Sequence, residues 1–91
     1  MYEKQAKILN HSGLHARPAS VFVENANNFK SAIEIARVGE EEDSVNAKSI
    51  VLLLTLGLSQ GEMAVIKANG ADEKEAVDSL TSLIKSGFGE L

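Results

Sequence analysis

A histidine, an arginine and a proline lie close together in residues 10–20, which read NHSGLHARPAS. His15 falls just before the first turn of a predicted helix, where backbone N–H groups have no acceptor inside the helix. The N–H groups of Ala16 and Arg17, the positive end of the helix dipole and the Arg17 guanidinium would converge near the imidazole. Pro18 stiffens this turn, since a first-turn residue needs no N–H donor and its ring fixes φ. We therefore predict an anion site built around a nucleophile.

This anion site suits phosphoryl chemistry. A neutral imidazole can attack a phosphoryl group and become phosphohistidine, and the backbone donors and Arg17 would then bind the phosphoryl charge. We expect His15 to hold phosphate covalently and reversibly. Two other interpretations stay open: an exposed loop histidine beside a solvated arginine, and a module that binds a free phosphorylated ligand or a protein without covalent chemistry.

Metal binding is another interpretation of the same segment. His11 lies four residues before His15, but Gly13 between them argues against a continuous helix, and the chain has only two histidines and no cysteine. We expect neither a metal nor a cofactor. The lack of cysteine also excludes disulfides and thiolate nucleophiles.

The composition is that of an ordinary globular chain. Its 91 residues are 44% hydrophobic and 24% charged, which predicts one domain over residues 1–91 with a small core and a surface site. The net charge is −4 and the basic residues are scattered singly, so nucleic acid is not an expected partner. No apolar run approaches the roughly 18–20 residues of a membrane helix, and the first residues lack a signal-peptide pattern. We expect a cytoplasmic protein that does not insert into membranes.

Alternating hydrophobicity predicts the strands. Residues 2–9 and 63–68 alternate with the period of half-buried strands. A hairpin is predicted from residues 31–39 to residues 45–47. The acidic run between its strands, EEED at 40–43, is interpreted as a solvated turn, with a docking patch as the alternative.

Helical periodicity predicts the elements that pack on these strands. A helix over residues 16–28 has an apolar face that consists of Ala19, Phe22, Val23 and Ala26. The last helix has an apolar face that consists of Ala76, Val77, Leu80, Leu83 and Ile84. Asp72 and Glu75 form a capping-box-like start to this helix, and Gly87 ends it. The order of the elements indicates an α+β fold, with an antiparallel sheet covered on one face by helices.

A short apolar run separates the hairpin from the last strand. Ser49 and Gly57 flank it and are predicted as the N-cap and the C′ residue of a helix, although the run could also form a strand. Six of the seven residues of Ile50–Leu56 are apolar. A short helix on a sheet buries only one side, so some of these side chains must face solvent.

The sequence resembles the histidine-containing phosphocarrier (HPr) proteins of the bacterial phosphoenolpyruvate-dependent sugar phosphotransferase system over essentially its whole length. Three motifs carry the resemblance, in the order and at the spacing of the family: GLHARPA at 13–19, KSI at 48–50 and NGADE at 69–73. The resemblance implies an open-faced β-sandwich, with four antiparallel strands under three helices in the order βαββαβα. It also implies a phosphoryl group on the δ1 nitrogen of His15, with Arg17 supporting it.

The same resemblance implies partners. An enzyme I-type donor would phosphorylate the chain, and EIIA-type acceptors would receive the phosphoryl group for sugar uptake. The chain would thus be a carrier and not itself an enzyme, and we expect it to be a monomer. Ile50, Val51 and Leu54 would form the exposed docking patch beside His15.

Two further expectations concern regulation and pathway. Ser49 matches the position that a dedicated kinase, an HPr kinase/phosphorylase, modifies in some members, and a phosphate is tolerated electrostatically at a helix N-terminus. Leu52 stands where many kinase-regulated members have a small residue. Residues 82–88 look like the ending of the nitrogen-type paralogue, and the turn at 40–44 is longer than in sugar-type carriers. A carrier of a nitrogen-type regulatory phosphorelay is therefore the alternative to one that serves sugar uptake.

Overall fold

The computed structural model describes residues 1–90 of the chain. Over these residues the chain forms a four-stranded sheet and three α-helices, with one 3₁₀ turn in the acidic connection and another after the last helix. The strands are β1 (Tyr2–Lys7), β2 (Ala32–Arg37), β3 (Val45–Asn46) and β4 (Met63–Asn69), and the helices are α1 (Ala16–Ala26), α2 (Ile50–Leu56) and α3 (Glu73–Lys85). None of the helices in this part of the chain is long and apolar enough to cross a membrane.

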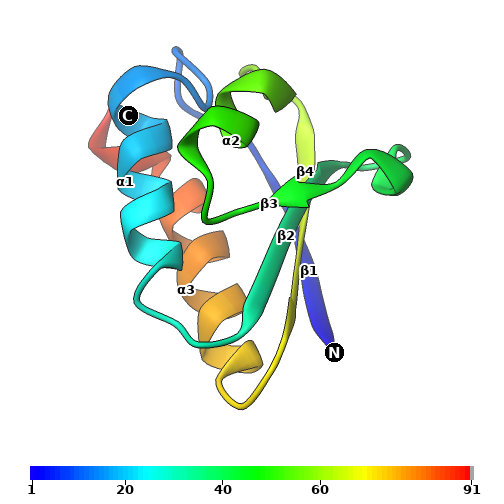
Figure 1. Cartoon of the computed structure of the whole chain (residues 1–91). Coiled ribbons are helices and arrows are strands. Elements are labelled where there is room, and N and C mark those ends of the chain that lie inside the picture. Colours follow the sequence, from blue (N-terminus) through cyan, green and yellow to red (C-terminus); the bar gives the residue numbers. More distant parts are fainter. Residues whose placement is uncertain (91) are drawn as a thin grey trace.

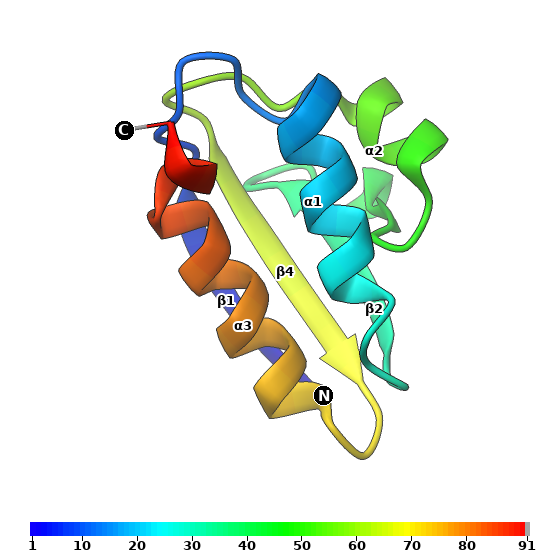
Figure 2. The same cartoon turned by 90° about the vertical axis from the view of Figure 1, so that its left-hand side faces the viewer.

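The strands pair antiparallel in the order β1-β4-β2-β3. The helices lie together on one face of this sheet, as Figures 1 and 2 show. The predicted fold, an open-faced sandwich in the order βαββαβα, is confirmed.

The hydrophobic core fills the space between the sheet and the helices. The large side chains that come from the strands or their ends are Ile8, Ile33, Ile35 and Ile66. Those that come from the helices are Phe22, Leu53, Leu80 and Ile84. Each is 2% exposed or less, and burying an aliphatic or aromatic side chain of this size stabilises a fold by about 1.5–3 kcal/mol. The apolar faces predicted for the first and last helices therefore pack as expected.

Two predicted elements are shorter in the structure. β1 ends at Lys7 and not at residue 9, because Ile8 pairs with the loop before β4: its N–H donates to the Glu62 carbonyl at 2.9 Å, and the Gly61 N–H donates to its carbonyl at 2.8 Å. α1 ends at Ala26 and not at residue 28. These changes leave the apolar pattern intact and shift only where the regular elements stop.

The predicted hairpin is the least regular part of the sheet. Its second strand has two residues, Val45 and Asn46, and Ala47 keeps one bond to the sheet, from its N–H to the Ile33 carbonyl at 2.9 Å. The acidic run forms the 3₁₀ turn Glu41–Asp43, which projects from the sheet in Figure 1. Glu42 and Asp43 are exposed, in agreement with a solvated turn.

The capping box expected at Asp72 and Glu75 is wrong. The Asp72 carboxylate makes no capping bond to α3. It accepts bonds from the N–H of Lys30 at 2.9 Å and from the N–H and hydroxyl of Ser31 at 3.0 and 2.5 Å. The Ser31 hydroxyl, followed by the Lys30 N–H, lowers the pKa of Asp72 to about 2. This carboxylate therefore joins the start of α3 to the turn between α1 and β2, because unpaired backbone donors 41 and 42 residues away in sequence lie within its reach.

Candidate functional site

His15 is the N-cap residue of α1, with an extended backbone at φ −127° and ψ 161°. Its side chain is exposed and makes no capping bond. The imidazole therefore stands at the start of the helix, as the sequence predicted, and is open to another molecule.

The loop before His15 rests on the connection between α2 and β4. The Leu14 N–H donates to the Leu58 carbonyl at 2.9 Å, and the Leu14 side chain is fully buried. Gly13 has φ +67°, and a Cβ built there would lie 2.5 Å from the same Leu58 oxygen. Figure 2 shows the two connections side by side at the end of the molecule where α1 begins. His15 is thus presented by a tightly packed loop.

Ala16 follows with φ +48°, a left-handed conformation that residues other than glycine rarely adopt. Such strain costs of the order of 1–3 kcal/mol and persists where the surrounding structure imposes it. Here the anchored Leu14 lies on one side of Ala16, and the buried ring of Pro18 lies on the other.

The Arg17 guanidinium contacts the end of the chain. Its Nη2 donates to the Phe88 carbonyl at 2.8 Å and lies 3.8 Å from a carboxylate oxygen of Glu90. The Arg17 side chain is nevertheless 62% exposed. The guanidinium is therefore placed beside the first turn of α1 while much of it stays open to solvent.

Glu90 is held in place by the loop that precedes His15. Its carboxylate accepts bonds from the Asn10 amide at 3.2 Å and from the Ser12 hydroxyl at 2.9 Å. These two donors, and then the charges of Arg17 and His11, hold the pKa of Glu90 below its usual value. The charges at the end of the chain thus form part of the electrostatic surroundings of the site.

Asn10 lies in the same loop but was not predicted to have a role in the site. It is fully buried, and its amide nitrogen donates to the Gly13 carbonyl at 2.9 Å. An asparagine directly after the apolar pair Ile8 and Leu9 was the available signal, because a buried amide group needs hydrogen-bond partners. No local signal pointed to Glu90, which lies 73 residues after Arg17.

The second predicted part of the site is α2. Ser49 caps it as predicted, since the Ser49 Oγ accepts a bond from the Leu52 N–H at 3.2 Å, and Gly57 ends it with φ +62°. The strand alternative for this run is therefore wrong. Leu53 is fully buried, whereas the side chains of the exposed face are Val51 at 68%, Leu52 at 42% and Leu54 at 40%.

This exposed face differs in one member from the expected patch of Ile50, Val51 and Leu54. Ile50 is half-buried and packs against the core, so it is less exposed than expected. Leu52 takes its place on the surface. The first residue of α2 packs against the core, which the spacing of residues along one helix could not show. We define the apolar patch from here on as Val51, Leu52 and Leu54.

The two parts of the site lie at the same end of the molecule. α1 packs against α2, and Figure 1 shows the start of α1 and the whole of α2 at one end of the sheet. Among residues 1–90 no three side chains of the metal-binding types cluster, and His11 and His15 are both exposed.

Comparisons with known proteins agree on one family. Residues 2–86 match the family model described as the PTS HPr component phosphorylation site. The chain is 44% identical over 84 residues to the phosphocarrier protein HPr of Buchnera aphidicola and, separately, to that of Haemophilus influenzae. Each match covers 92% of this chain and 95% of the relative.

A solved structure agrees with these matches. The crystal structure of HPr-C-His from Thermoanaerobacter tengcongensis superposes with a TM-score of 0.92 at 45% identity. The match covers 100% of this chain and 99% of that one. The likeness therefore extends over the described fold and is not confined to the motifs.

Proposed function

The chain belongs to the HPr family of phosphocarrier proteins of the phosphotransferase system, and from this premise we propose that His15 is the residue that carries the phosphoryl group. The observation that carries the proposal is the exposed imidazole at the N-cap of α1, two residues before the largely exposed Arg17 side chain. Helix N-termini favour bound anions because their N–H groups are unpaired.

The transfer step needs only His15 and a phosphorylated donor. The δ1 nitrogen of the neutral imidazole attacks phosphorus, a new N–P bond forms, and the bond between phosphorus and the donor breaks, with its electron pair staying on the donor. The reverse step passes the group to the next acceptor. No cofactor takes part, since the protein contributes positioning and charge stabilisation alone.

Arg17 supports the phosphorylated state. Its exposed guanidinium donates to a single carbonyl oxygen, that of Phe88, and lies 3.8 Å from Glu90. A phosphoryl group on His15 is a stronger acceptor than a carbonyl, so the Arg17 guanidinium turns toward it. The backbone N–H groups of Ala16 and Arg17 donate to it as well. Glu90 then loses part of its favourable contact with Arg17.

The patch Val51, Leu52 and Leu54 is the docking surface for partners. An exposed apolar surface next to a charged group allows burial to supply affinity while the phosphoryl group stays free for transfer. We propose an enzyme I-type donor and EIIA-type acceptors as these partners. The chain acts as a monomer of one domain in the cytoplasm, and it neither binds nucleic acid nor inserts into membranes.

Two additional assignments belong to this proposal. Ser49 is the site of regulatory phosphorylation by an HPr kinase/phosphorylase, since its hydroxyl caps the N-terminus of α2, where a phosphate is tolerated electrostatically. Sugar uptake is the pathway, in keeping with the name HPr of the relatives. The alternative is a nitrogen-type relay, because the ending at 82–88 looks like that paralogue.

The test is to incubate the chain with phosphoenolpyruvate and each of the two first enzymes, sugar-type and nitrogen-type. We expect the intact mass to increase by one phosphoryl group, and the group to be acid-labile and alkali-stable, as phosphohistidine is. His15→Ala should abolish this product and the matched His11→Ala should retain it. An unchanged product from His15→Ala would contradict the proposal, and the more efficient first enzyme identifies the pathway.

A further inference from the structure

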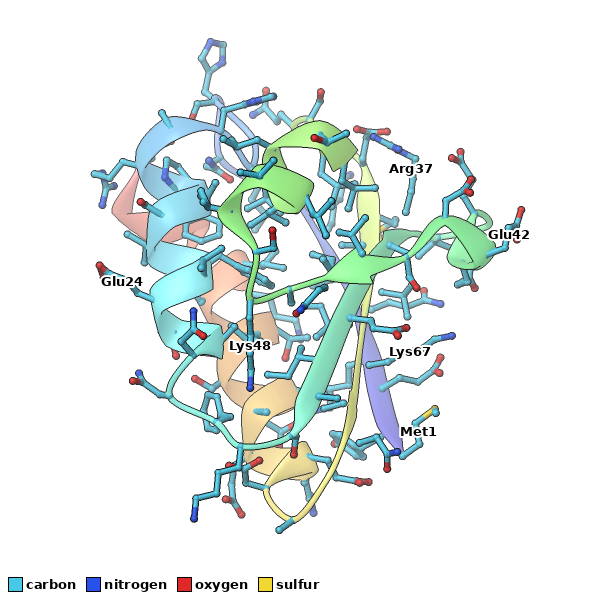
Figure 3. All side chains as sticks on the ribbon, viewed as in Figure 1. Met1, Glu24, Arg37, Glu42, Lys48 and Lys67 are labelled. Atoms are coloured by element: carbon cyan, nitrogen blue, oxygen red, sulfur yellow. The ribbon has the colours of Figure 1, made fainter. Side chains whose placement is uncertain are left out.

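One charged pair outside the His15 loop connects the elements that build the site. Arg37, the last residue of β2, donates from Nε to one carboxylate oxygen of Glu62 at 2.6 Å and from Nη2 to the other at 3.2 Å. The same Nη2 lies 3.1 and 3.3 Å from the carbonyl oxygens of Leu56 and Gly57. A cation stabilises the carbonyl end of a helix, and Figure 3 shows Arg37 where α2 leads into β4.

Glu62 extends this set of bonds into the connection between α2 and β4, residues 57–62. Its carboxylate also accepts the Ser59 N–H at 2.7 Å. Arg37 and Glu62 are 26% and 32% exposed, so the pair is partly shielded from water and strengthened accordingly. The pair therefore holds both ends and the middle of residues 57–62.

Residues 57–62 are also the support of the His15 loop. The Leu58 carbonyl accepts the Leu14 N–H at 2.9 Å, the Gln60 amide donates to the Leu9 carbonyl at 3.1 Å, and the Gly61 N–H donates to the Ile8 carbonyl at 2.8 Å. A displacement of residues 57–62 would therefore move the loop that carries His15. The same displacement would move the end of α2, which continues directly into this connection.

We propose that the Arg37–Glu62 pair is a positioning clamp that fixes the apolar patch of α2 relative to His15. The inference rests on the proposed function, in which one partner must contact the patch and reach the imidazole at the same time. Patch and nucleophile come from different elements. Residues 57–62 hydrogen-bond to the loop that precedes His15 and continue directly from α2, which carries the patch. Arg37 and Glu62 touch no reacting atom, so they act by placing other residues.

A comparison pair separates this role from a general effect of charge on stability. Lys4 and Asp78 form an ion pair of 2.7 Å between β1 and α3, with side chains 45% and 41% exposed. Neither side chain bonds to α2, to residues 57–62 or to the His15 loop. Lys4→Met is therefore the matched control for Arg37→Met. In both variants the methionine removes the charge and keeps an unbranched apolar stem.

The experiment measures phosphoryl transfer from phosphoenolpyruvate through enzyme I, with this chain as the varied substrate. We expect Arg37→Met to raise KM by about threefold to tenfold while kcat changes less than about twofold, because docking and not chemistry is impaired. Arg37→Lys, a milder variant, should show an intermediate rise in KM, since one ammonium cannot hold two carboxylate oxygens and two carbonyls. Lys4→Met should leave KM unchanged.

A second readout does not depend on transfer. The backbone amide resonances of Leu14 and Val51 should shift in Arg37→Met and stay in place in Lys4→Met. If KM and these resonances match wild type in both Arg37 variants, or if Lys4→Met has the same effect, the clamp is wrong. If wild type itself is not phosphorylated on His15, the proposed function fails, and the resonances still decide whether Arg37 positions the two parts.

Discussion

The proposed docking role of the apolar patch leads to a quantitative prediction for Leu54. This side chain is 40% exposed in the free chain, whereas its neighbour Leu53 is fully buried. Fully burying a leucine stabilises by about 1.5–3 kcal/mol, so covering the exposed part of Leu54 in a complex contributes about 0.6–1.2 kcal/mol. A factor of ten in Kd corresponds to about 1.4 kcal/mol.

Two substitutions separate loss of apolar contact from added charge. Leu54→Gln should raise the Kd for enzyme I by about threefold to sevenfold. Leu54→Glu should raise it by about tenfold or more, because a carboxylate is also desolvated in the complex. Both side chains suit a helix almost as well as leucine and keep part of its apolar stem. The free energy of unfolding should therefore fall by less than about 2 kcal/mol, since about 60% of Leu54 is buried in the free chain.

The assay is calorimetric titration of each variant with enzyme I, together with urea unfolding. Leu53→Ala is the buried counterpart, and it should lose about 2–5 kcal/mol of stability. If Leu54→Glu loses stability on that scale and its folded fraction binds enzyme I normally, then Leu54 belongs to the core and the docking argument fails.

Three further predictions test the site and its supports. Arg17→Ala should keep the fold, since the side chain is 62% exposed. It should slow phosphoryl transfer by about tenfold or more, because charge-assisted hydrogen bonds are lost. Transfer rates equal to wild type, to and from His15, would rule out a role for Arg17. Gly13→Ala should destabilise the chain more than Gly61→Ala, because both positions have positive φ but only at Gly13 would the new Cβ lie 2.5 Å from the Leu58 oxygen; equal Tm values for the two variants would contradict this. Asp72→Asn should be less stable than wild type at neutral pH, and the difference should shrink as the pH falls from about 4 to about 2. The lowered pKa of folded Asp72 gives stability that is present above the unfolded pKa of 3.8 and is lost on protonation near the folded pKa of about 2. A stability difference in urea unfolding that stays constant over this pH range would contradict this prediction.

Local patterns determined the elements and the position of the proposed nucleophile, His15. The alternation in residues 2–9, the apolar spacing of Ala19, Phe22 and Ala26, and the cap at Ser49 depend on neighbours a few positions away. His15 at the start of α1 follows from the same short-range rules. Such features can be predicted because their partners lie on the same turn or strand, so sequence separation is a good guide to distance.

Contacts between distant segments were decided by the tertiary structure alone. Asp72 bonds to Lys30 and Ser31 rather than capping its own helix, and Arg17 contacts Phe88 and Glu90. A polar side chain takes the donors or acceptors that packing brings within reach, and their identity depends on how all elements pack together. The sequence by itself therefore determined that His15 stands at the start of a helix, and the packing of the whole chain determined which charges and loops surround that residue.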